Sequence, residues 1–336
     1  MKILHFGTIL AAASWLPSAA LAAEKKSAPA VSITEHDDRL RIELDGELFT
    51  EYIFKGEERF FPVFYPVNGP GQVPMTRKFP LEESEGEDTD HPHHQSLWFA
   101  HSDVNEENFW AIKTSRGREP GHTVHQGFTE IESGDGGGHF VSENAYVAPD
   151  GKTIMTDTRT VRFYPVDDSL ASRILDITIA FHASNGPVTL RDEKDAGMAI
   201  RLTPELQVAR RKDGKNMIPA NGKLINSEGV RDVDTWGKRA RWVDAWGTVG
   251  DDAVGVALMD HPSNPRHPTW WHSRTYGLVT ANAFGKHFFE KLDDPRAGDF
   301  EIPEGETETF RWRFVFHRED PKTADVEGEF KAFSED

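Results

Sequence analysis

The segment that decides the fold reads Arg39-Leu40-Arg41-Ile42-Glu43-Leu44-Asp45-Gly46. Charged and apolar residues alternate through its first six positions, which is the period of a β-strand with one buried face. The Asp-Gly pair that follows is typical of a tight hairpin turn, and a second strand is expected over residues 48–54. The fold is therefore expected to open with an antiparallel strand pair.

The same two-residue period recurs along the chain, and amphipathic segments of helical length are scarce. The short apolar runs are separated by many of the 28 glycines and 20 prolines, as the turns of an antiparallel sheet protein require. We predict an all-β fold, a large antiparallel β-sandwich with few short helices. Other predicted strands are residues 160–164, a strand marked by Leu175, Ile177, Ile179 and Phe181, and a strand marked by Phe310, Trp312, Phe314 and Phe316.

Length and strand spacing favour a single large domain over residues 33–336. The alternative is two stacked β-domains with a boundary near Asn185-Gly186-Pro187. We favour one domain because the sequence contains neither an internal repeat nor a linker-like segment in this range.

The N-terminus has the features of a secretory signal peptide over residues 1–23. Lys2 gives it a positive start, residues 9–16 are largely apolar, and Ala20-Leu21-Ala22 fits a cleavage site, so cleavage is expected near Ala22. A membrane anchor is the alternative, but the apolar stretch is short and rich in alanine. Residues 24–32 are predicted to form a flexible leader. We expect a periplasmic or secreted protein without membrane insertion.

Composition limits the partners and the chemistry. The formal net charge is −18, and nucleic acids and anionic membranes both require a cationic surface, so neither is an expected partner. A highly anionic glycan is disfavoured as well, unless the cleft carries a local basic patch. The chain has no cysteine, which excludes thiol catalysis, cysteine-ligated zinc and iron–sulfur clusters.

Ten of the fifteen histidines fall in two windows, residues 91–125 and 261–287. Histidine titrates near neutral pH and is the commonest neutral metal ligand, so a dense group indicates proton transfer, a metal site or both. The first window opens with Asp90-His91-Pro92-His93-His94-Gln95-Ser96-Leu97-Trp98. We expect the fold to bring the two windows to one site.

A metal site needs two or three converging imidazoles and an open position. If the protein uses a cofactor, we expect a divalent metal ion whose predicted ligands are His91, His93 and His125. The alternative is that individual histidines only form hydrogen bonds with neighbouring backbone groups.

The second window contains Trp270-Trp271-His272-Ser273-Arg274. Tryptophan presents a flat apolar face with a polar edge, which suits the C–H face and hydroxyl rim of a sugar ring. Arginine offers a rigid fork for a carboxylate or for paired hydroxyls. Side chains alternate in an extended segment, so one tryptophan is expected in the core and the other in the site, and His272 and Arg274 share one face.

An acidic stretch, Arg191-Asp192-Glu193-Lys194-Asp195, precedes an apolar run that ends at Arg201. A solvated charged turn is one interpretation. In the functional interpretation, one of its carboxylates reaches the site to orient a histidine, bind hydroxyls or act as a base, and we select Glu193.

These patterns assign roles to particular residues. The catalytic residues are predicted to be His93, His94, His272, Arg274 and Glu193. The substrate-binding residues are predicted to be Trp98, His261, Asn264, Trp271 and Asn282.

Several longer motifs are typical of one family. They are residues 90–101, Asp103-Val104-Asn105 with Phe109-Trp110, residues 261–266, 269–277 and 281–285, and Arg311-Trp312-Arg313-Phe314 with His317. Together they resemble the PmoA-like family of exported bacterial proteins of unknown function, over nearly the whole mature chain. Where family members commonly have Lys-Glu-Gly before the mid-chain strand, this chain has Lys194-Asp195-Ala196-Gly197.

The resemblance implies a large β-sandwich related to galactose-mutarotase-like supersandwiches, and an association with the use of glycans and oxidised sugars. The family label comes from a membrane-bound methane monooxygenase subunit. That function does not transfer, because this sequence has no membrane span.

We therefore predict an exported carbohydrate-active enzyme with a His/Arg/carboxylate site for acid–base chemistry. It would hydrolyse, eliminate or epimerise a glycoside, and a 3-keto sugar is one candidate because its ketone acidifies the neighbouring C–H. Metal assistance is a variant of this mechanism. Two alternatives stay open: a glycan-binding protein without catalysis, and a periplasmic metal-binding protein that uses histidines.

Overall fold

The computed structural model describes residue 1 and residues 29–115, 117–166, 172–212 and 216–336. Strands dominate these residues and form two large antiparallel sheets, so the predicted all-β sandwich is confirmed. The predicted signal peptide beyond Met1 and residues 24–28 of the predicted leader lie outside the described residues. No helix within the described ranges is both long enough and apolar enough to cross a membrane.

The first sheet has eight strands in the order β1-β2-β3-β4-β5-β11-β18-β17. Its first five strands are consecutive in the chain, and the pairing of β5 with β11 joins them to strands from the second half. The bounds are β1 (Val31–Glu35), β2 (Arg39–Leu44), β3 (Glu47–Ile53), β4 (Val63–Val67), β5 (Leu97–His101), β11 (Ala196–Arg201), β18 (Leu278–Asn282) and β17 (Trp270–Trp271).

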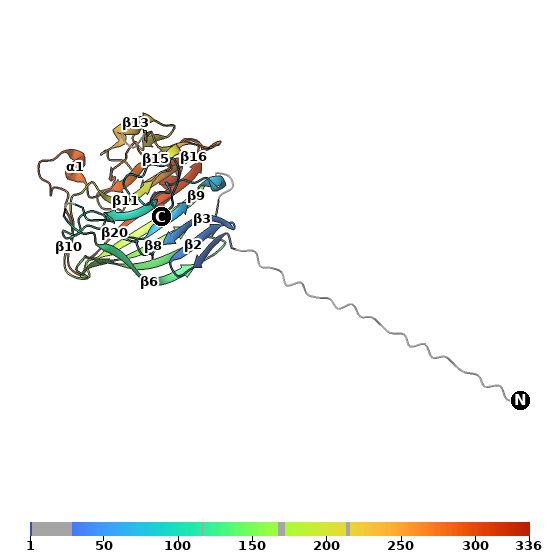
Figure 1. The fold of residues 1–336 in the computed structure, drawn as a ribbon, viewed down its shortest axis with the longest axis horizontal. Coiled ribbons are helices and arrows are strands. Elements are labelled where there is room, and N and C mark those ends of the chain that lie inside the picture. The colour runs from blue at the N-terminus through green and yellow to red at the C-terminus, as the bar shows by residue number, and fades with distance from the viewer. Residues whose placement is uncertain (2–28, 116, 167–171, 213–215) are drawn as a thin grey trace.

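The second sheet also has eight strands, in the order β14-β15-β16-β20-β9-β8-β7-β6. It shares one apolar core with the first sheet, and in Figure 1 its strands β6 and β8 lie close to β2 and β3. The bounds are β14 (Lys223–Asn226), β15 (Trp242–Val249), β16 (Asp252–Asp260), β20 (Thr307–Arg318), β9 (Arg173–His182), β8 (Thr153–Phe163), β7 (Gly138–Val147) and β6 (His122–Glu132).

Smaller elements surround the two sheets. Two strand pairs are separate from them, β10 (Val188–Leu190) with β19 (Phe300–Ile302), and β12 (Ala209–Lys212) with β13 (Asn216–Pro219). The described α-helices are α1 (Lys286–Glu290) and α2 (Val326–Glu335), and the short 3₁₀ helices are η1 (Pro70–Gln72), η2 (Pro204–Leu206) and η3 (Asp232–Thr235).

The hairpin of β2 and β3 has the predicted turn, although β1 precedes it in the chain and pairs with β2. Leu44 of β2 pairs with Glu47 of β3, so the loop consists of Asp45 and Gly46. Both loop residues have positive φ, 50° and 79°, as a type I′ turn requires. The predicted leader is two residues too long, because β1 begins at Val31, which is fully buried and pairs with Leu44 of β2.

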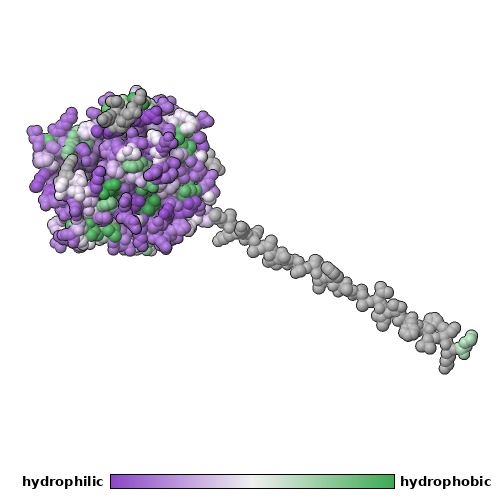
Figure 2. All heavy atoms as spheres, viewed as in Figure 1, coloured by the Kyte–Doolittle hydropathy of each residue, from purple (hydrophilic) through white to green (hydrophobic). Residues whose placement is uncertain are grey.

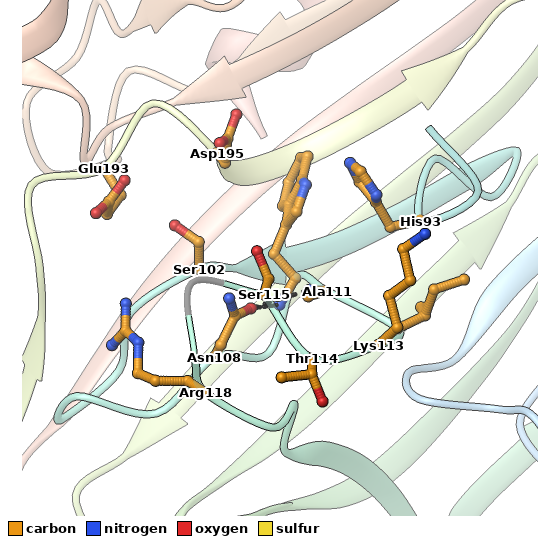
Figure 3. A pocket seen from close by; sticks show the side chains of 12 residues that line it. His93, Ser102, Asn108, Ala111, Lys113, Thr114, Ser115, Arg118, Glu193 and Asp195 are labelled. Carbon is orange, nitrogen blue, oxygen red and sulfur yellow. Dashed lines mark hydrogen bonds between the residues drawn. The ribbon is translucent and has the colours of Figure 1, made fainter. Parts of the chain in front are cut away.

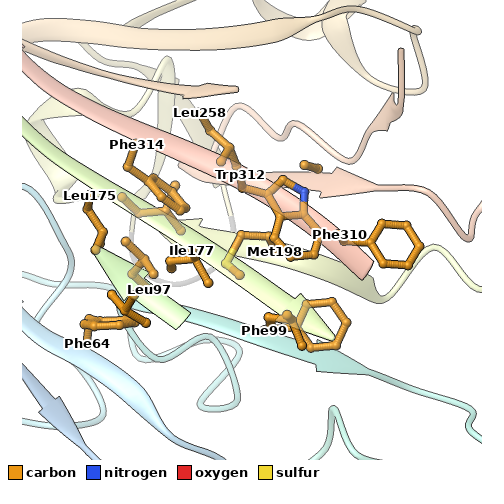
Figure 4. Packing of buried hydrophobic residues seen from close by; sticks show 14 of the residues in the cluster. Phe64, Leu97, Phe99, Leu175, Ile177, Met198, Leu258, Phe310, Trp312 and Phe314 are labelled. Carbon is orange, nitrogen blue, oxygen red and sulfur yellow. The ribbon is translucent and has the colours of Figure 1, made fainter. Parts of the chain in front are cut away.

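The two sheets pack face to face around one continuous apolar core. Inward residues of β4, β5 and β11 meet those of β9, β16 and β20, and the apolar faces predicted for β9 and β20 are buried here (Figure 4). The ring centroid of Phe99 on β5 lies 5.1 Å from that of Phe181 and 5.8 Å from that of Trp312. These contacts fix β5, the strand beside the candidate site, against the opposite sheet.

The outward faces of the sheets have separate apolar clusters. On the second sheet, α2 packs Phe330 and Phe333 against a patch that includes Val315. The first sheet carries what we call the outer cluster, which comprises Phe61, Val63, Trp98, Ala100, Trp110, Ala199 and Leu278. The candidate site lies over this cluster. The rest of the visible surface is mostly hydrophilic, in keeping with the net charge (Figure 2).

Phe99→Ala is expected to lower the free energy of unfolding by about 3–5 kcal/mol, because it leaves a cavity between the sheets. Val124→Ala is the control, since Val124 is 40% exposed on β6, and it should change that free energy by no more than about 0.5 kcal/mol. Urea denaturation measures both variants. If both substitutions lowered the free energy of unfolding by similar, small amounts, the packing of Phe99 between the two sheets would be contradicted.

Candidate functional site

A cavity of about 180 Å³ lies over the outer cluster. β5 and β11 are antiparallel neighbours, so the loop after β5 meets the acidic loop before β11, and Ser102 N donates a hydrogen bond to Asp195 O. In Figure 3, Glu193, Asp195 and His93 occupy one side of the cavity and Lys113 and Arg118 the other. The lining residues are His93, Ser102, Asn108, Trp110, Ala111, Ile112, Lys113, Thr114, Ser115, Arg118, Glu193 and Asp195.

Two buried arginines hold the histidine loop in place. The fully buried Arg77 donates hydrogen bonds to the carbonyl oxygens of Asp90 and His91, and to Asp90 Oδ1 at 2.8 Å. Arg201, which is also fully buried, donates from Nη2 to the same Oδ1 at 3.0 Å. The carboxylate of Asp90 therefore accepts hydrogen bonds from two buried guanidinium groups.

This arrangement controls the ionisation of Asp90. Burial opposes ionisation, but a hydrogen bond with His91 and the charges of Arg201 and Arg77 hold the pKa of Asp90 well below its usual range. The His91 Nδ1 atom lies 2.6 Å from Asp90 Oδ2. Asp90 is thus ionised at neutral pH and compensates both guanidinium groups.

His94 is held within a stack of rings. Its ring lies 4.8 Å from that of His91 and 5.6 Å from that of Trp98, in near-parallel orientations. Arg201 Nη1 lies 3.3 Å from His94 Nδ1, and a guanidinium can only donate, so Nδ1 accepts and the proton is on Nε2. Burial, with the charges of His93 and Arg201, holds the pKa of His94 well below its usual range.

His93 is the histidine of this loop that lines the cavity. Its ring meets that of His94 edge to face, with centroids 4.6 Å apart. Burial, with the charge of His91, lowers the pKa of His93 to about 4, although Asp195 opposes the shift. The imidazole is therefore neutral at pH 7.

The acidic loop brings two carboxylates to the cavity, those of Glu193 and Asp195. Lys194 Nζ lies 2.8 Å from each Asp195 oxygen. Burial opposes ionisation, but the charges of Lys194, His272 and His93 hold the pKa of Asp195 below its usual range. The loop is fixed by Asn282, whose Nδ2 donates to the carbonyl oxygens of Glu193 and Lys194.

Close strand packing at the base of this loop requires a glycine. Gly197 has φ +114°, and a Cβ placed there would lie 2.1 Å from Ala281 O on β18. No larger residue fits at this position without separating β11 from β18. Gly197 thereby lets the acidic loop lie beside the second histidine window.

His272 follows β17 and reaches the acidic loop. Its Nδ1 donates to Lys194 O at 2.8 Å and lies 3.9 Å from Asp195 Oδ1. Burial lowers the pKa of His272 to about 4, although Asp195 opposes the shift. Asp195 thus lies within electrostatic range of both His93 and His272, and the two histidine windows meet around it.

Arg274 connects the second window to the first. Its guanidinium lies 5.6 Å from the ring centroid of Tyr276, and that ring stacks on His91 at 5.3 Å. Arg201 also lies over the Tyr276 ring, at 4.6 Å. His272 and Arg274 thus lie near the 91–94 segment, but neither lines the cavity and Arg274 is exposed, so their catalytic roles stay predictions.

Two donors in this region have no hydrogen-bond partner among the described residues. They are Trp110 Nε1 and Ser102 Oγ, and both residues line the cavity. Trp98 Nε1, in the outer cluster, is also buried without a partner in that part of the chain. Buried donors are nearly always paired in folded proteins, so a polar ligand is the natural partner for those at the cavity.

The assignment of Trp271 to the substrate is wrong. Its side chain is fully buried in the core between the sheets, and its Nε1 donates to Ala240 O at 2.9 Å. Trp271 pairs with Ala281, whose side chain also faces the core, so it points away from the outer face that carries His272. Trp98 belongs to the outer cluster and stacks beneath His94, but does not line the cavity.

Three other residues predicted to bind substrate have structural roles instead. His261 lies on the second sheet, where its ring packs on Phe333 and its Nε2 is 3.1 Å from Arg311 Nη1. Asn264 bridges Asp260 and the backbone of Arg311. Asn282 is fully buried and, as described, holds the acidic loop. All three have structural partners that occupy their polar groups.

The predicted metal triad of His91, His93 and His125 does not form. His125 packs on Phe54 and Phe128 and lines a different cavity, on β6. Within the described residues, no three His, Asp or Glu side chains are arranged to hold one metal ion.

Some site residues were missed from the sequence. Trp110, Lys113 and Arg118 lie in a polar loop after β5 that has no strand pattern to place it. Asp195 was considered, but Glu193 was preferred. Arg201 had a usable signal, because it ends an apolar run at a position where a solvated charge would be unusual.

The fold is thus an antiparallel sandwich with a polar, aromatic-floored cavity on the outer face of one sheet. The chain belongs to a family of unknown function, DUF6807, whose model matches residues 39–331. No protein of curated function matches the sequence. The PmoA-like label expected from the motifs is not the name that this family model carries, and it stays a prediction.

Solved structures resemble the chain distantly. An α-galactosidase from Lactobacillus brevis has a TM-score of 0.39 at 8% identity, covering 87% of this chain but only 40% of its own. A putative aldose 1-epimerase from Escherichia coli K12 has a TM-score of 0.34 at 11% identity, and the match covers 86% of this chain and 99% of that protein. A galactose mutarotase-like protein from Lactobacillus casei has a TM-score of 0.34 at 9% identity, and the match covers 85% of this chain and 100% of that protein. These scores support no conclusion about activity.

Asp90→Asn is expected to lower the free energy of unfolding at pH 7 by about 3–5 kcal/mol, because Arg77 and Arg201 lose their counter-charge. The pKa of Asp90 is lowered from 3.8 in the folded state, so its contribution is present above pH 3.8 and is lost as the pH falls through the lower folded value. The difference in the free energy of unfolding between wild type and Asp90→Asn should therefore stay constant near neutral pH and become smaller only in strong acid.

Denaturant unfolding curves across this pH range measure the difference. Asp252→Asn is the control, because its ion pair with Arg318 is exposed and should contribute less than about 1 kcal/mol. A wild-type advantage that disappeared between pH 6 and 7 would contradict the assignment, since histidine and not Asp90 titrates there.

Proposed function

We propose that the chain is a carbohydrate-active enzyme that performs acid–base chemistry on a sugar bound in the cavity over the outer cluster. One observation carries the proposal: His93, Glu193 and Asp195 converge on a cavity lined by Trp110, whose buried indole N–H has no partner among the described residues. Convergent titratable groups with shifted pKa values in a concave site are typical of active sites.

The lining suits a sugar. Trp110 offers an apolar surface for a C–H face, while its Nε1 and Ser102 Oγ offer hydrogen bonds to hydroxyl groups. The cavity is compact, with a volume of about 180 Å³.

The shifted pKa values suggest separate roles. Asp195 is ionised at neutral pH and is the proposed base, with His272 as a positioning residue behind it. His93 is neutral, and a neutral imidazole can donate a hydrogen bond to a carbonyl oxygen on which charge develops. Glu193, the carboxylate selected from the sequence, is proposed to bind hydroxyls, and His94 to support His93.

A 3-keto glycoside is the proposed substrate. Asp195 removes the proton from the carbon between the ketone and the anomeric carbon, and His93 hydrogen-bonds the ketone oxygen as it gains charge. The carbon–carbon double bond then forms as the bond from the anomeric carbon to the leaving oxygen breaks. The proton held by Asp195 passes to that oxygen, which completes an elimination; addition of water to the double bond would make the net reaction a hydrolysis.

The remaining sequence predictions belong to the same proposal. We propose that the protein is periplasmic or secreted, because residues 1–23 are predicted to be a signal peptide. The PmoA-like resemblance expected from the sequence motifs agrees with a sugar substrate.

The test is turnover of paired glycosides that differ only by oxidation at carbon 3. Asp195→Asn should lower kcat/KM for the keto substrate by about 10²-fold or more, the usual scale for a positioned base. His139→Gln is the control, because its ring pairs with the exposed Glu130 on β6. Sugar binding without turnover of either form would favour a non-catalytic glycan-binding protein.

The pH profile gives a second prediction. The reaction needs Asp195 ionised and His93 neutral. The neutral state of His93 is lost as the pH falls through about 4, and Asp195, whose pKa is lowered from 3.8, stays ionised to lower pH. We expect kcat/KM to be level from about pH 6 to 8 and to fall in acid. A profile that fell through the ordinary histidine value of 6.5 would show that these imidazoles are not held neutral.

A further inference from the structure

A second cavity, of about 430 Å³, adjoins the first. Ile112 lines both, so this side chain forms part of the wall between them. The second cavity is lined by Glu57, Glu58, Arg59, Phe60, Pro80, Leu81, Gln95 and Ile112. A substrate held over Trp110 could extend past Ile112 into this space.

Arg59 is the unusual group in this cavity. It is partly buried, and its Nη1 donates to Gln95 Oε1. Its Nε is buried without a hydrogen-bond partner among the described residues, and no carboxylate in those ranges forms an ion pair with it. Burial lowers the pKa of Arg59, and no acidic neighbour offsets that shift.

Several desolvated guanidinium groups among the described residues have a carboxylate partner, and Arg266, which has none, donates to three carbonyl oxygens instead. Arg77 and Arg201 share Asp90, Arg159 pairs with Asp157, and Arg313 pairs with Asp176. Glu57 and Glu58 also line the second cavity, but both are exposed and neither pairs with Arg59. An uncompensated, partly buried cation is costly unless a ligand supplies the charge.

The other walls are largely apolar. Phe60, Pro80, Leu81 and Ile112 line the cavity, and the Phe60 ring is stacked on His122 at 4.4 Å. The space therefore suits a ligand with an apolar body and one anionic group that reaches Arg59.

We propose that this second cavity binds the leaving group of the substrate and that Arg59 receives a carboxylate on it. The leaving-group role rests on the proposed function, but carboxylate binding at Arg59 can be tested by binding measurements alone. A guanidinium binds a carboxylate with charge-assisted hydrogen bonds, and the unpartnered Nε is available for one of them. The carboxylate belongs either to an aromatic acid or to a sugar acid.

The site is coupled to the histidine loop. Gln95 accepts from Arg59 and donates from Nε2 to Pro92 O at 3.5 Å, one residue before His93. A leaving group bound at Arg59 would therefore rest against the segment that carries the cavity-lining histidine. This places the bond to be broken near Ile112, between the two cavities.

The test uses two matched pairs of probes, 4-hydroxybenzoate with 4-hydroxybenzamide, and glucuronate with glucose. Isothermal titration calorimetry on the wild-type protein should show that at least one carboxylate binds about tenfold or more tightly than its neutral partner. Arg59→Gln should abolish that preference, and Arg59→Lys should keep part of it. Arg39→Gln, an exposed arginine paired with Asp38 and Glu51, is the control and should keep all of it.

A preference for benzoate identifies an aromatic acid, and a preference for glucuronate identifies a sugar acid; either supports the site. If neither carboxylate is preferred, or if the preference survives Arg59→Gln, the inference is overturned. A cooperative thermal unfolding transition confirms that each variant is folded, and its shift on adding ligand gives a second measure of binding. If the wild-type protein turns over no glycoside but keeps the Arg59-dependent preference, the proposed function is wrong and the anion site still stands.

Discussion

The convergence of two buried guanidinium groups on Asp90 supports the rest of the site. Arg77 extends from the loop after β4 and Arg201 from the end of β11, so one carboxylate joins two parts of the first sheet. Without Asp90, two desolvated cations would lie side by side. Because Arg201 also donates to His94 Nδ1, the same charge cluster fixes the tautomer of that ring and supports the stack on which His93 rests.

Strand pattern was sufficient to predict the fold class and several strands. The alternation through residues 39–44 and the Asp45-Gly46 pair gave the first hairpin, and the apolar faces of β9 and β20 were readable from their period. The pairing of β5 with β11 was not readable, because it joins segments about 100 residues apart, and the sequence contains no local signal for long-range register.

Residue type alone was a poor guide to the site. Trp271 and Trp270 are adjacent and chemically alike, and only the pairing of β17 with β18 decides which one enters the core. His261, Asn264 and His125 lie near other histidines in sequence but have structural partners on the second sheet. Alternation separates Trp270 from Trp271, but it could not place His272 and Arg274 together, because β17 ends at Trp271 and His272 is buried while Arg274 is exposed.

The central claim is that Asp195 moves a proton from a sugar carbon, and hydrogen exchange at that carbon tests it most directly. The protein would be incubated with a 3-keto glycoside in deuterated water and the sugar followed by NMR. The account predicts deuterium at the carbon between the ketone and the anomeric carbon, appearing with wild type and not with Asp195→Asn. A glycoside that binds in the cavity but exchanges no faster than in buffer would contradict it.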